Sequence, residues 1–570
     1  MAVAALSAAG CMSPEEYRQQ ADDLAYPLVE DQRRELLGRE PGEFTIEPAP
    51  DSLRARLDAE IEARGNDPQA PWPALENLTL IDCLEIAAEN SRDFQTRREQ
   101  LYQSALSLTV QQWRFQAQPN GGGAAGFDGT LQEATDVSGS GFLGLDRLFG
   151  FGAVVLSDIG LGLGRSLTFS DGFNPVTTAG ISVTQPLLQG FGRRIVVEPL
   201  TQAQRNLLYE VRSYERFRRT FAFDVASRYF RILQSVANLD NELNNARSLK
   251  AVRERNEALA ERGRLSDIQL DQARQNELAA ENRVIDTRQS LQAQLDNFKL
   301  FLGLPVQMEL TLDIDELTGR VDEGLQEVTL DQDTAIRVAL NARYDHLTVL
   351  DRVIDAERQI YITEDALEGV LNFITTVNAS SDPDDLFSFD SDEVTWSAGI
   401  DFTLPVNQVL ERNAYRNAII GVNRARRNAV ESADTIVADI RDRFRELTTR
   451  KQSFDIQDLS TKLSERRVES SRLNLEAGRA QTRDLLESQA ALIASQNARV
   501  GAAVDYQLAV LAFYRDLEVL AFDDGGLRLD EQRLNEILAQ LVPEDVQALN
   551  TDSSPASAPA GAPESTEAGA

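Results

Sequence analysis

The chain has 570 residues, with 57 Lys and Arg against 91 Asp and Glu, so its formal net charge is −34. This balance argues against a nucleic-acid partner, because phosphate binding needs a positive surface. It suits a solvated acidic surface, or an aqueous passage whose wall favours cations. The single histidine, His346, excludes a His-rich metal site and argues against a Ser-His-Asp triad. No nucleotide-binding or catalytic motif occurs, so we expect no enzymatic activity, no metal and no cofactor.

The N-terminal segment has the features of an export signal. Residues 1–11 are small and apolar and end at Cys11, as at the end of a bacterial lipoprotein signal peptide, where the Cys is lipidated. Two features depart from that pattern, because no basic region precedes the segment and Ala8 stands where Leu is usual. An ordinary cleaved signal is the alternative. Either way, we expect export from the cytoplasm.

Two polar segments flank the central part of the chain. Residues 12–77 are charged and rich in Pro, and predict an extended N-terminal arm with short helices. Residues 551–570 consist almost wholly of Ser, Pro, Ala, Gly, Thr and Glu, and predict a disordered tail.

The central part contains helices of unusual predicted length. No Gly or Pro occurs from Leu200 to Arg262, which as one helix would be roughly 95 Å long. A second such stretch runs from Arg264 to Leu302. The pattern recurs from Val422 to Ala477 and then, with Gly501 inside it, to about Leu520. Helices this long need a coiled-coil partner.

The long stretches are two copies of one unit. Residues of the first long stretch recur in the second, with similar side chains and the same spacing, 215 positions later. This constant offset indicates an internal duplication. The spacing of three and four residues is that of the seam between coiled-coil helices. The matched pairs are Phe221 and Ile436, Val225 and Ile440, Tyr229 and Phe444, Ile232 and Leu447, Asp224 and Asp439, Arg228 and Arg443, and Gly263 and Gly478.

Strand-like sequence precedes each long helix. Residues from Trp396 to Leu404 alternate between apolar and polar, and 180–187 align with 399–406 at an offset of 219. Further candidates are 126–135, 154–169 and 371–378, so the first half has more strand-like sequence than one pair requires. We expect two strands per half and four per chain. Because four strands cannot close a barrel, a trimer would supply 3 × 4 = 12.

From about residue 76 to 522, the sequence resembles the TolC-like outer membrane efflux proteins. Residues 78–90 resemble the opening helix of that family, and Val328–Leu330 resembles the start of its second copy. The motif 184–192 resembles the place where a barrel strand enters the long helix. It contains Gln185 and Pro186, and Pro405 is the matching residue of the second half. Residues 261–264 and 476–479 resemble the turns of the two helical hairpins, centred on Gly263 and Gly478.

The resemblance implies a mainly α-helical fold with a transmembrane β-barrel portion. It would consist of two tandem repeats of a long helical hairpin and a strand pair, at residues 78–304 and 328–522. Equatorial segments would follow at 305–327 and 523–550. A homotrimer would form a 12-stranded barrel in the lipid of the bacterial outer membrane and a helical tunnel through the periplasm.

The implied function is that of a passive outer membrane channel in a tripartite efflux or type I secretion system. Its partners would be a periplasmic adaptor and an inner membrane pump of the RND, ABC or MFS type. The alternative is a non-conducting periplasmic coiled-coil scaffold, which explains the long helices but not the paired strands that end at Pro186 and Pro405.

The resemblance also implies a gate at the tips of the hairpins. The matching acidic residues are Asp484 and Glu487, which lie three apart and so share a helix face. In a trimer they would place six carboxylates around one axis and attract cations. Ala480 stands where the family can have a locking Arg, with Arg479 and Arg483 as possible substitutes. The alternative for the two acidic residues is a solvated helix face.

Overall fold

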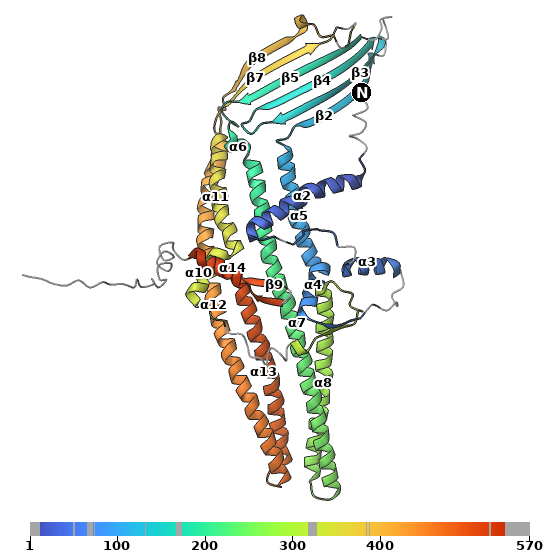
Figure 1. Ribbon diagram of the computed structural model, residues 1–570, viewed down its shortest axis with the longest axis vertical. Helices are drawn as coiled ribbons and strands as arrows, with labels where there is room; N and C mark the ends of the chain where they lie inside the picture. The colour runs from blue at the N-terminus through green and yellow to red at the C-terminus, as the bar shows by residue number, and fades with distance from the viewer. Residues whose placement is uncertain are drawn as a thin grey trace, which may run out of the picture.

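The computed structural model describes residues 12–40, 42–48, 52–64, 72, 74–130, 133–166, 174–316, 328–382, 385–386, 388–523 and 526–541. The segment 1–11 with Cys11, residues 317–327 of the expected linker, and residues 542–570 with the expected tail lie outside these ranges. The molecule is elongated, with a β-sheet at one end and two helical hairpins at the other (Figure 1). None of the described helices combines the length and the apolar character that a membrane crossing requires.

The first half contains one of the two long hairpins. It begins with α4 (Leu80–Asn90) and α5 (Arg92–Trp113), and the hairpin consists of α7 (Glu198–Glu261) and α8 (Asp267–Leu302). The short helix α6 (Arg193–Val196) links the sheet to α7. Thr79 starts α4 through a capping box, in which its hydroxyl accepts from the Asp82 N–H and Asp82 accepts from the Thr79 N–H.

The second half repeats this order of helices. It consists of α10 (Gln332–Ala342), α11 (Tyr344–Asp365), α12 (Val409–Glu476) and α13 (Thr482–Asp516). The Gly- and Pro-free stretch from Val422 lies inside a longer helix, because α12 begins at Val409. Gly421 lies inside the helix, with no atom within 4 Å of a Cβ built on it. A single solvated glycine costs a 68-residue helix only about 1 kcal/mol and does not end it.

A single six-stranded antiparallel sheet lies at one end of the molecule (Figure 1). Its order is β2-β3-β4-β5-β7-β8. The strands are β2 (Gln118–Thr130), β3 (Glu133–Leu148), β4 (Val154–Ser166), β5 (Asn174–Pro186), β7 (Val370–Ser380) and β8 (Thr395–Thr403), with the 3-10 turn η1 (Ser391–Glu393) before β8. The expectation of four strands per chain is therefore wrong. Four strands come from the first half and two from the second, so the count of twelve for a trimer does not follow.

Smaller elements surround the helices at mid-height (Figure 1). The C-terminal part forms a hairpin of β9 (Leu520–Asp523) and β10 (Gly526–Leu529), followed by α14 (Glu531–Leu541). β1 (Leu75–Leu78) pairs in parallel with β6 (Leu310–Leu312). The N-terminal arm contains α2 (Pro14–Leu37) and α3 (Leu53–Arg64), and α2 packs against α5 and α7.

The main hydrophobic core lies where the two halves meet at mid-height. The seam residues Phe221, Val225, Tyr229 and Ile232 of α7 are buried there together with Ile436 and Ile440 of α12. Phe94, Phe217, Phe221 and Phe301 add a chain of ring contacts with centroid distances of 5.2–5.8 Å. The duplicated spacing seen in the sequence thus marks residues that pack into this shared core.

Candidate functional site

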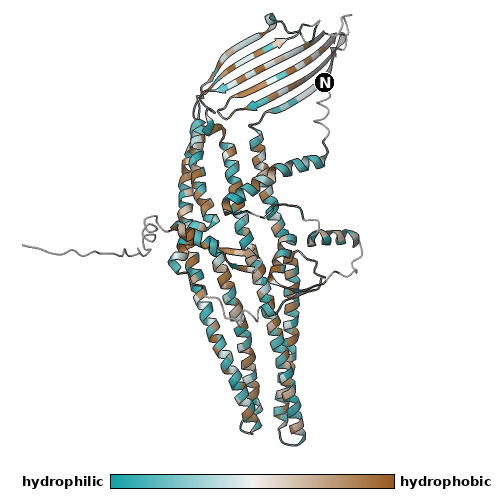
Figure 2. Cartoon of the chain, in the orientation of Figure 1, coloured by the Kyte–Doolittle hydropathy of each residue, from teal (hydrophilic) through white to brown (hydrophobic). Residues whose placement is uncertain are grey.

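The sheet has two chemically different faces. Successive residues of a strand point to opposite faces, and the register brings residues of one kind into line across the strands. One row, apolar except for Ser157, joins Leu145, Ser157, Ile181, Val377 and Trp396. Hydropathy accordingly alternates along the strands in Figure 2.

We call the two sides the apolar face and the polar face. The apolar face includes Leu143, Leu145, Ile159, Leu161, Leu163, Ile181, Phe373, Val377, Trp396, Ile400 and Phe402, all exposed in the single chain. Trp396 is 76% exposed and Ile400 69%, so the part of the chain that the structure describes leaves this face uncovered. A face of this kind needs a non-aqueous neighbour.

Most side chains of the polar face are small. A row across it joins Asp158, Gly180, Asn378 and Thr395. Its other members include Asn120, Gly122, Ser140, Phe142, Gly144, Asp146, Leu156, Gly160, Gly162, Thr178, Ser182, Thr184, Asn372, Ile374, Thr376, Ser397, Gly399, Asp401 and Thr403, together with the apolar Leu148, Val154 and Val176. Among these described residues the charged ones are all aspartates, so the polar face is anionic.

The junction between β5 and α7 contains the predicted strand-to-helix motif. Pro186 ends β5 opposite Asn372, and the Gln185 side-chain amide donates to the Pro186 carbonyl at 2.7 Å. The Gly190 N–H donates to the Asp365 carboxylate at 3.0 Å, which ties this turn to the end of α11. Pro405 follows β8, and the Gln408 side chain nearby donates to the Leu367 carbonyl at 2.7 Å. In both halves the sheet therefore joins the long helix through a hydrogen-bonded turn.

The two hairpin turns have the same geometry. Gly263 and Gly478 have φ values of 65° and 71°, a left-handed conformation in which a glycine is favoured. In the first turn the Arg264 N–H donates to the Leu259 carbonyl at 2.9 Å. In the second, the Arg479 N–H donates to the Asn474 carbonyl at 2.8 Å. Each turn closes its helix in the same way, 215 residues apart.

The charged residues at the second tip have different partners. Asp484 accepts from the Gln481 N–H at 2.9 Å and so caps the start of α13. Glu487 pairs with Arg467 at 3.0 Å, and both side chains are more than half exposed. The structure shows no ion pair for Arg479 or Arg483, both in its described part. The structure thus places all four residues near one solvated turn but does not join Asp484 to Glu487.

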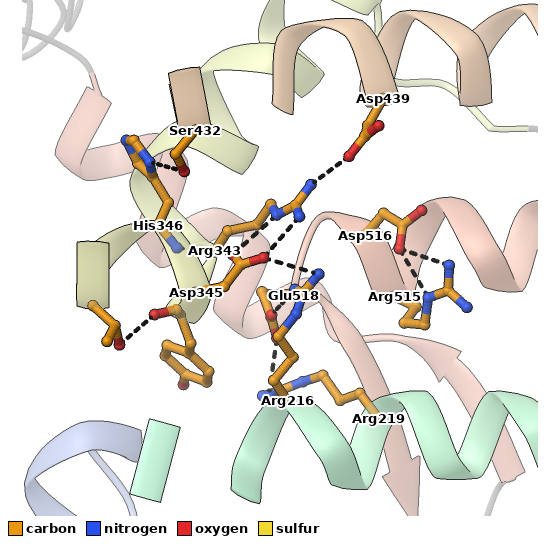
Figure 3. Close-up of polar contacts among 12 residues, drawn as sticks. Arg216, Arg219, Arg343, Asp345, His346, Ser432, Asp439, Arg515, Asp516 and Glu518 are labelled. Atoms are coloured by element: carbon orange, nitrogen blue, oxygen red, sulfur yellow. Dashed lines mark hydrogen bonds and ion pairs between the residues drawn. The ribbon is translucent and has the colours of Figure 1, made fainter. Parts of the chain in front are cut away.

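A dense ionic cluster joins the two halves at mid-height (Figure 3). Glu518, between α13 and β9, has a fully buried side chain that accepts from Arg216 and, at 3.2 Å, from Arg219 of α7. Arg216 also lies 3.3 Å from Asp345, which pairs with Arg343 at 2.8 Å. These contacts connect α7 of the first half to α11 and the end of α13.

A second part of the cluster is centred on Asp516. It accepts from Arg443 and Arg515, each at 2.8 Å. Burial alone would raise the pKa of Asp516, but the two guanidinium groups outweigh burial and hold this pKa below its ordinary value. The same competition, with Arg343 and Arg216 as the cations, lowers the pKa of Asp345. Both carboxylates are therefore ionised at neutral pH.

His346 lies beside this cluster. Its ring Nδ1 is 2.9 Å from the Ser432 hydroxyl, and the residue is buried. Burial lowers its pKa, so the ring is neutral at pH 7. No group of three or more candidate metal ligands gathers within the described ranges. His346 therefore joins α11 to α12 as part of the packing.

Sequence reasoning missed most of the ionic cluster. Asp439 and Arg443 were found as duplicated residues, and both take part in it. Glu518, Arg216 and Arg219 carried no signal, because their pairing depends on contacts between positions about 300 residues apart.

The comparisons with known proteins agree with this architecture. Residues 158–304 match the family model described as outer membrane efflux protein. The fold is similar to that of the Campylobacter jejuni CmeC outer membrane channel, with a TM-score of 0.57 and 15% identity, over 82% of this chain and 90% of that one. It is also similar to the outer membrane protein VceC from Vibrio cholerae, with a TM-score of 0.56 and 14% identity, over 77% of this chain and 95% of that one. The open state of the Neisseria gonorrhoeae MtrE outer membrane channel is a third match, with a TM-score of 0.57 and 12% identity, over 77% of this chain and 88% of that one. No curated protein matches the sequence.

The fold is similar to that of outer membrane channels, and part of the chain matches the outer membrane efflux protein family. The resemblance to the TolC-like outer membrane efflux proteins that the sequence predicted is confirmed. The predicted location is confirmed with it: the protein lies in the outer membrane, with its long helical part in the periplasm. Proteins of this family are channels, so the chain is not an enzyme.

Proposed function

We propose that the protein is the passive outer membrane conduit of a tripartite efflux or type I secretion system. Three copies would close their sheets into one barrel and their hairpins into one tunnel. A periplasmic adaptor would open the tunnel, and an inner membrane pump of the RND, ABC or MFS class would deliver the substrate and supply the energy.

The observation that carries this proposal is the sheet with two exposed faces. The apolar face fits lipid, and the polar face fits a water-filled interior. The outer edges of β2 and β8 pair with no other strand among the described residues, and unpaired strand edges inside a membrane are costly. Pairing β8 of one copy with β2 of the next would satisfy both edges. A periplasmic scaffold would leave the apolar face in water.

The helical tips are the proposed gate. Asp484 and Glu487 would repeat around the trimer axis and favour cations, while Arg479 and Arg483 would counter part of that charge. Cys11, which is three residues before the start of α2, is the proposed site of lipidation. An acyl chain there would add a second membrane attachment to that of the barrel.

Membrane fractionation tests this proposal against the scaffold. We expect the protein in the outer membrane fraction, migrating as a trimer in unboiled gel samples and as a monomer after boiling. A monomer that stays in solution without detergent would contradict the channel.

A further inference from the structure

The hairpin of β3 and β4 has no counterpart in the described residues of the second half. β2 and β7 each follow the second helix of their repeat, whereas β5 and β8 each precede the long helix. These four strands form the duplicated pairs, and their matching ends are Pro186 and Pro405. The hairpin, residues 133–166, is inserted between β2 and β5.

The inserted hairpin is an integral part of the sheet. β3 pairs with β2 from Asp146 to Asp136, and β4 pairs with β5 along eleven consecutive residues of β4, Val154–Gly164. Its turn packs against the β5–α7 junction, because the Gly192 N–H donates to the Phe151 carbonyl at 3.3 Å. Gly152, at a φ of 101°, leaves room for the Gly190 carbonyl, which would lie 2.8 Å from an added Cβ. The hairpin is thus held at its base as well as along its strands.

Six strands per chain change the size of the closed barrel. Three chains contribute 3 × 6 = 18 strands. With strands about 4.8 Å apart and tilted by about 40°, 18 strands give a backbone radius of about 18 Å, against about 12 Å for 12 strands. Allowing roughly 4 Å for side chains, the free radius is about 14 Å for 18 strands and about 8 Å for 12.

The inserted strands also extend the anionic polar face. They add Ser140, Gly144, Asp146, Asp158 and Gly160, alongside the apolar Phe142 and Leu156. Most of these side chains are short and so take up little of the interior. The described residues of the polar face include aspartates but no Lys or Arg. A face with this charge disfavours anions and favours neutral or cationic solutes.

We propose that the β3–β4 hairpin widens the exit, so that it admits bulky hydrated solutes, neutral or cationic, with radii up to about 12 Å. Size selection then falls to the helical tips. This inference rests on the proposed trimeric channel and adds to it the class of solute that the outer end can pass.

Size-graded thiol labelling tests this width. Gly399→Cys places a thiol on the polar face at the middle of β8, where a built Cβ has no atom within 4 Å. Ala398→Cys, one residue earlier, places it on the apolar face as the matched control. The native Cys83 is buried, and burial raises the pKa of its thiol, so it adds little background. Cells carrying each variant, and the parent, are treated from outside with neutral maleimide polymers of increasing radius.

We expect Gly399→Cys to react with polymers of about 10–12 Å radius and Ala398→Cys to react with none. A cationic thiol reagent should also modify Gly399→Cys several-fold faster than an anionic reagent of equal size. If Gly399→Cys is trimeric in the outer membrane but reacts only with polymers of about 8 Å radius or less, the inferred width is wrong and the proposed function still stands. Absence of the outer membrane trimer would instead overturn the proposed function.

Discussion

Removing the charge of Glu518 tests whether the ionic cluster holds the two halves together. Glu518→Gln keeps the size of the side chain but leaves Arg216 and Arg219 without their buried carboxylate. Breaking a buried ion pair costs about 3–5 kcal/mol, and the lower end applies because Arg216 keeps its contact with Asp345. For a chain of 570 residues, unfolding entropy of about 2.1 cal/mol/K per residue converts 3 kcal/mol into a fall in Tm of about 2–3 °C.

The assay is thermal unfolding of the purified trimer in one detergent, followed by circular dichroism and by trimer loss on gels. Glu487→Gln is the matched control, because it removes the same charge from an exposed pair with Arg467. Exposed pairs contribute about 0–1 kcal/mol, so we expect its Tm to fall by less than about 1 °C. Equal effects of the two substitutions would refute the reasoning.

Three further predictions concern pH, a glycine contact and the tips. Glu215 of α7 is buried, but its ion pairs with Arg218 and Arg33 outweigh burial and lower its pKa. With Asp345 and Asp516, it contributes stability above its ordinary pKa and loses it as pH falls through the lowered value. Tm should therefore drop below about pH 4, and an unchanged Tm down to pH 3 would contradict this. Gly303→Ala should destabilise the protein more than Gly263→Ala. Both positions have a positive φ, at which Ala costs about 1–2 kcal/mol. At Gly303 the new Cβ would also lie 2.1 Å from the Asn90 carbonyl oxygen. Equal melting temperatures would argue against that contact. Asp484→Asn with Glu487→Gln, which keeps an acceptor for the Gln481 N–H, should weaken cation selectivity in bilayers without lowering Tm by more than about 1 °C. Unchanged selectivity would exclude these residues from the gate.

The helical part of the fold was largely predictable because its signals are local and repeated. The 215-residue offset linked Phe221 to Ile436 and Gly263 to Gly478, and the structure buries the first pair and places the second in equivalent turns. The Gly- and Pro-free stretch from Val422 did not mark the start of α12, because a single glycine is a weak stop inside a very long helix.

The sheet was less predictable because β3 lacks a clear alternating pattern. Its glycines at 139, 141 and 144 stand where apolar or polar side chains would reveal the two faces. Long-range pairs were also invisible, as with Arg443, whose carboxylate partner Asp516 lies at the end of another helix. The equivalent Arg228 instead lies over the Phe301 ring, 4.2 Å from its centroid, so the duplication did not conserve the pairing.

Electrical recording from purified trimers in planar lipid bilayers tests the channel most directly. We expect discrete conductance steps with a reversal potential that shows cation preference in a salt gradient, because the polar face and the tips carry carboxylates. Trimers that insert stably but never conduct, even when the charges of Asp484 and Glu487 are removed to disturb the gate, would contradict a conduit. Anion preference would contradict the assignment of the polar face to its interior.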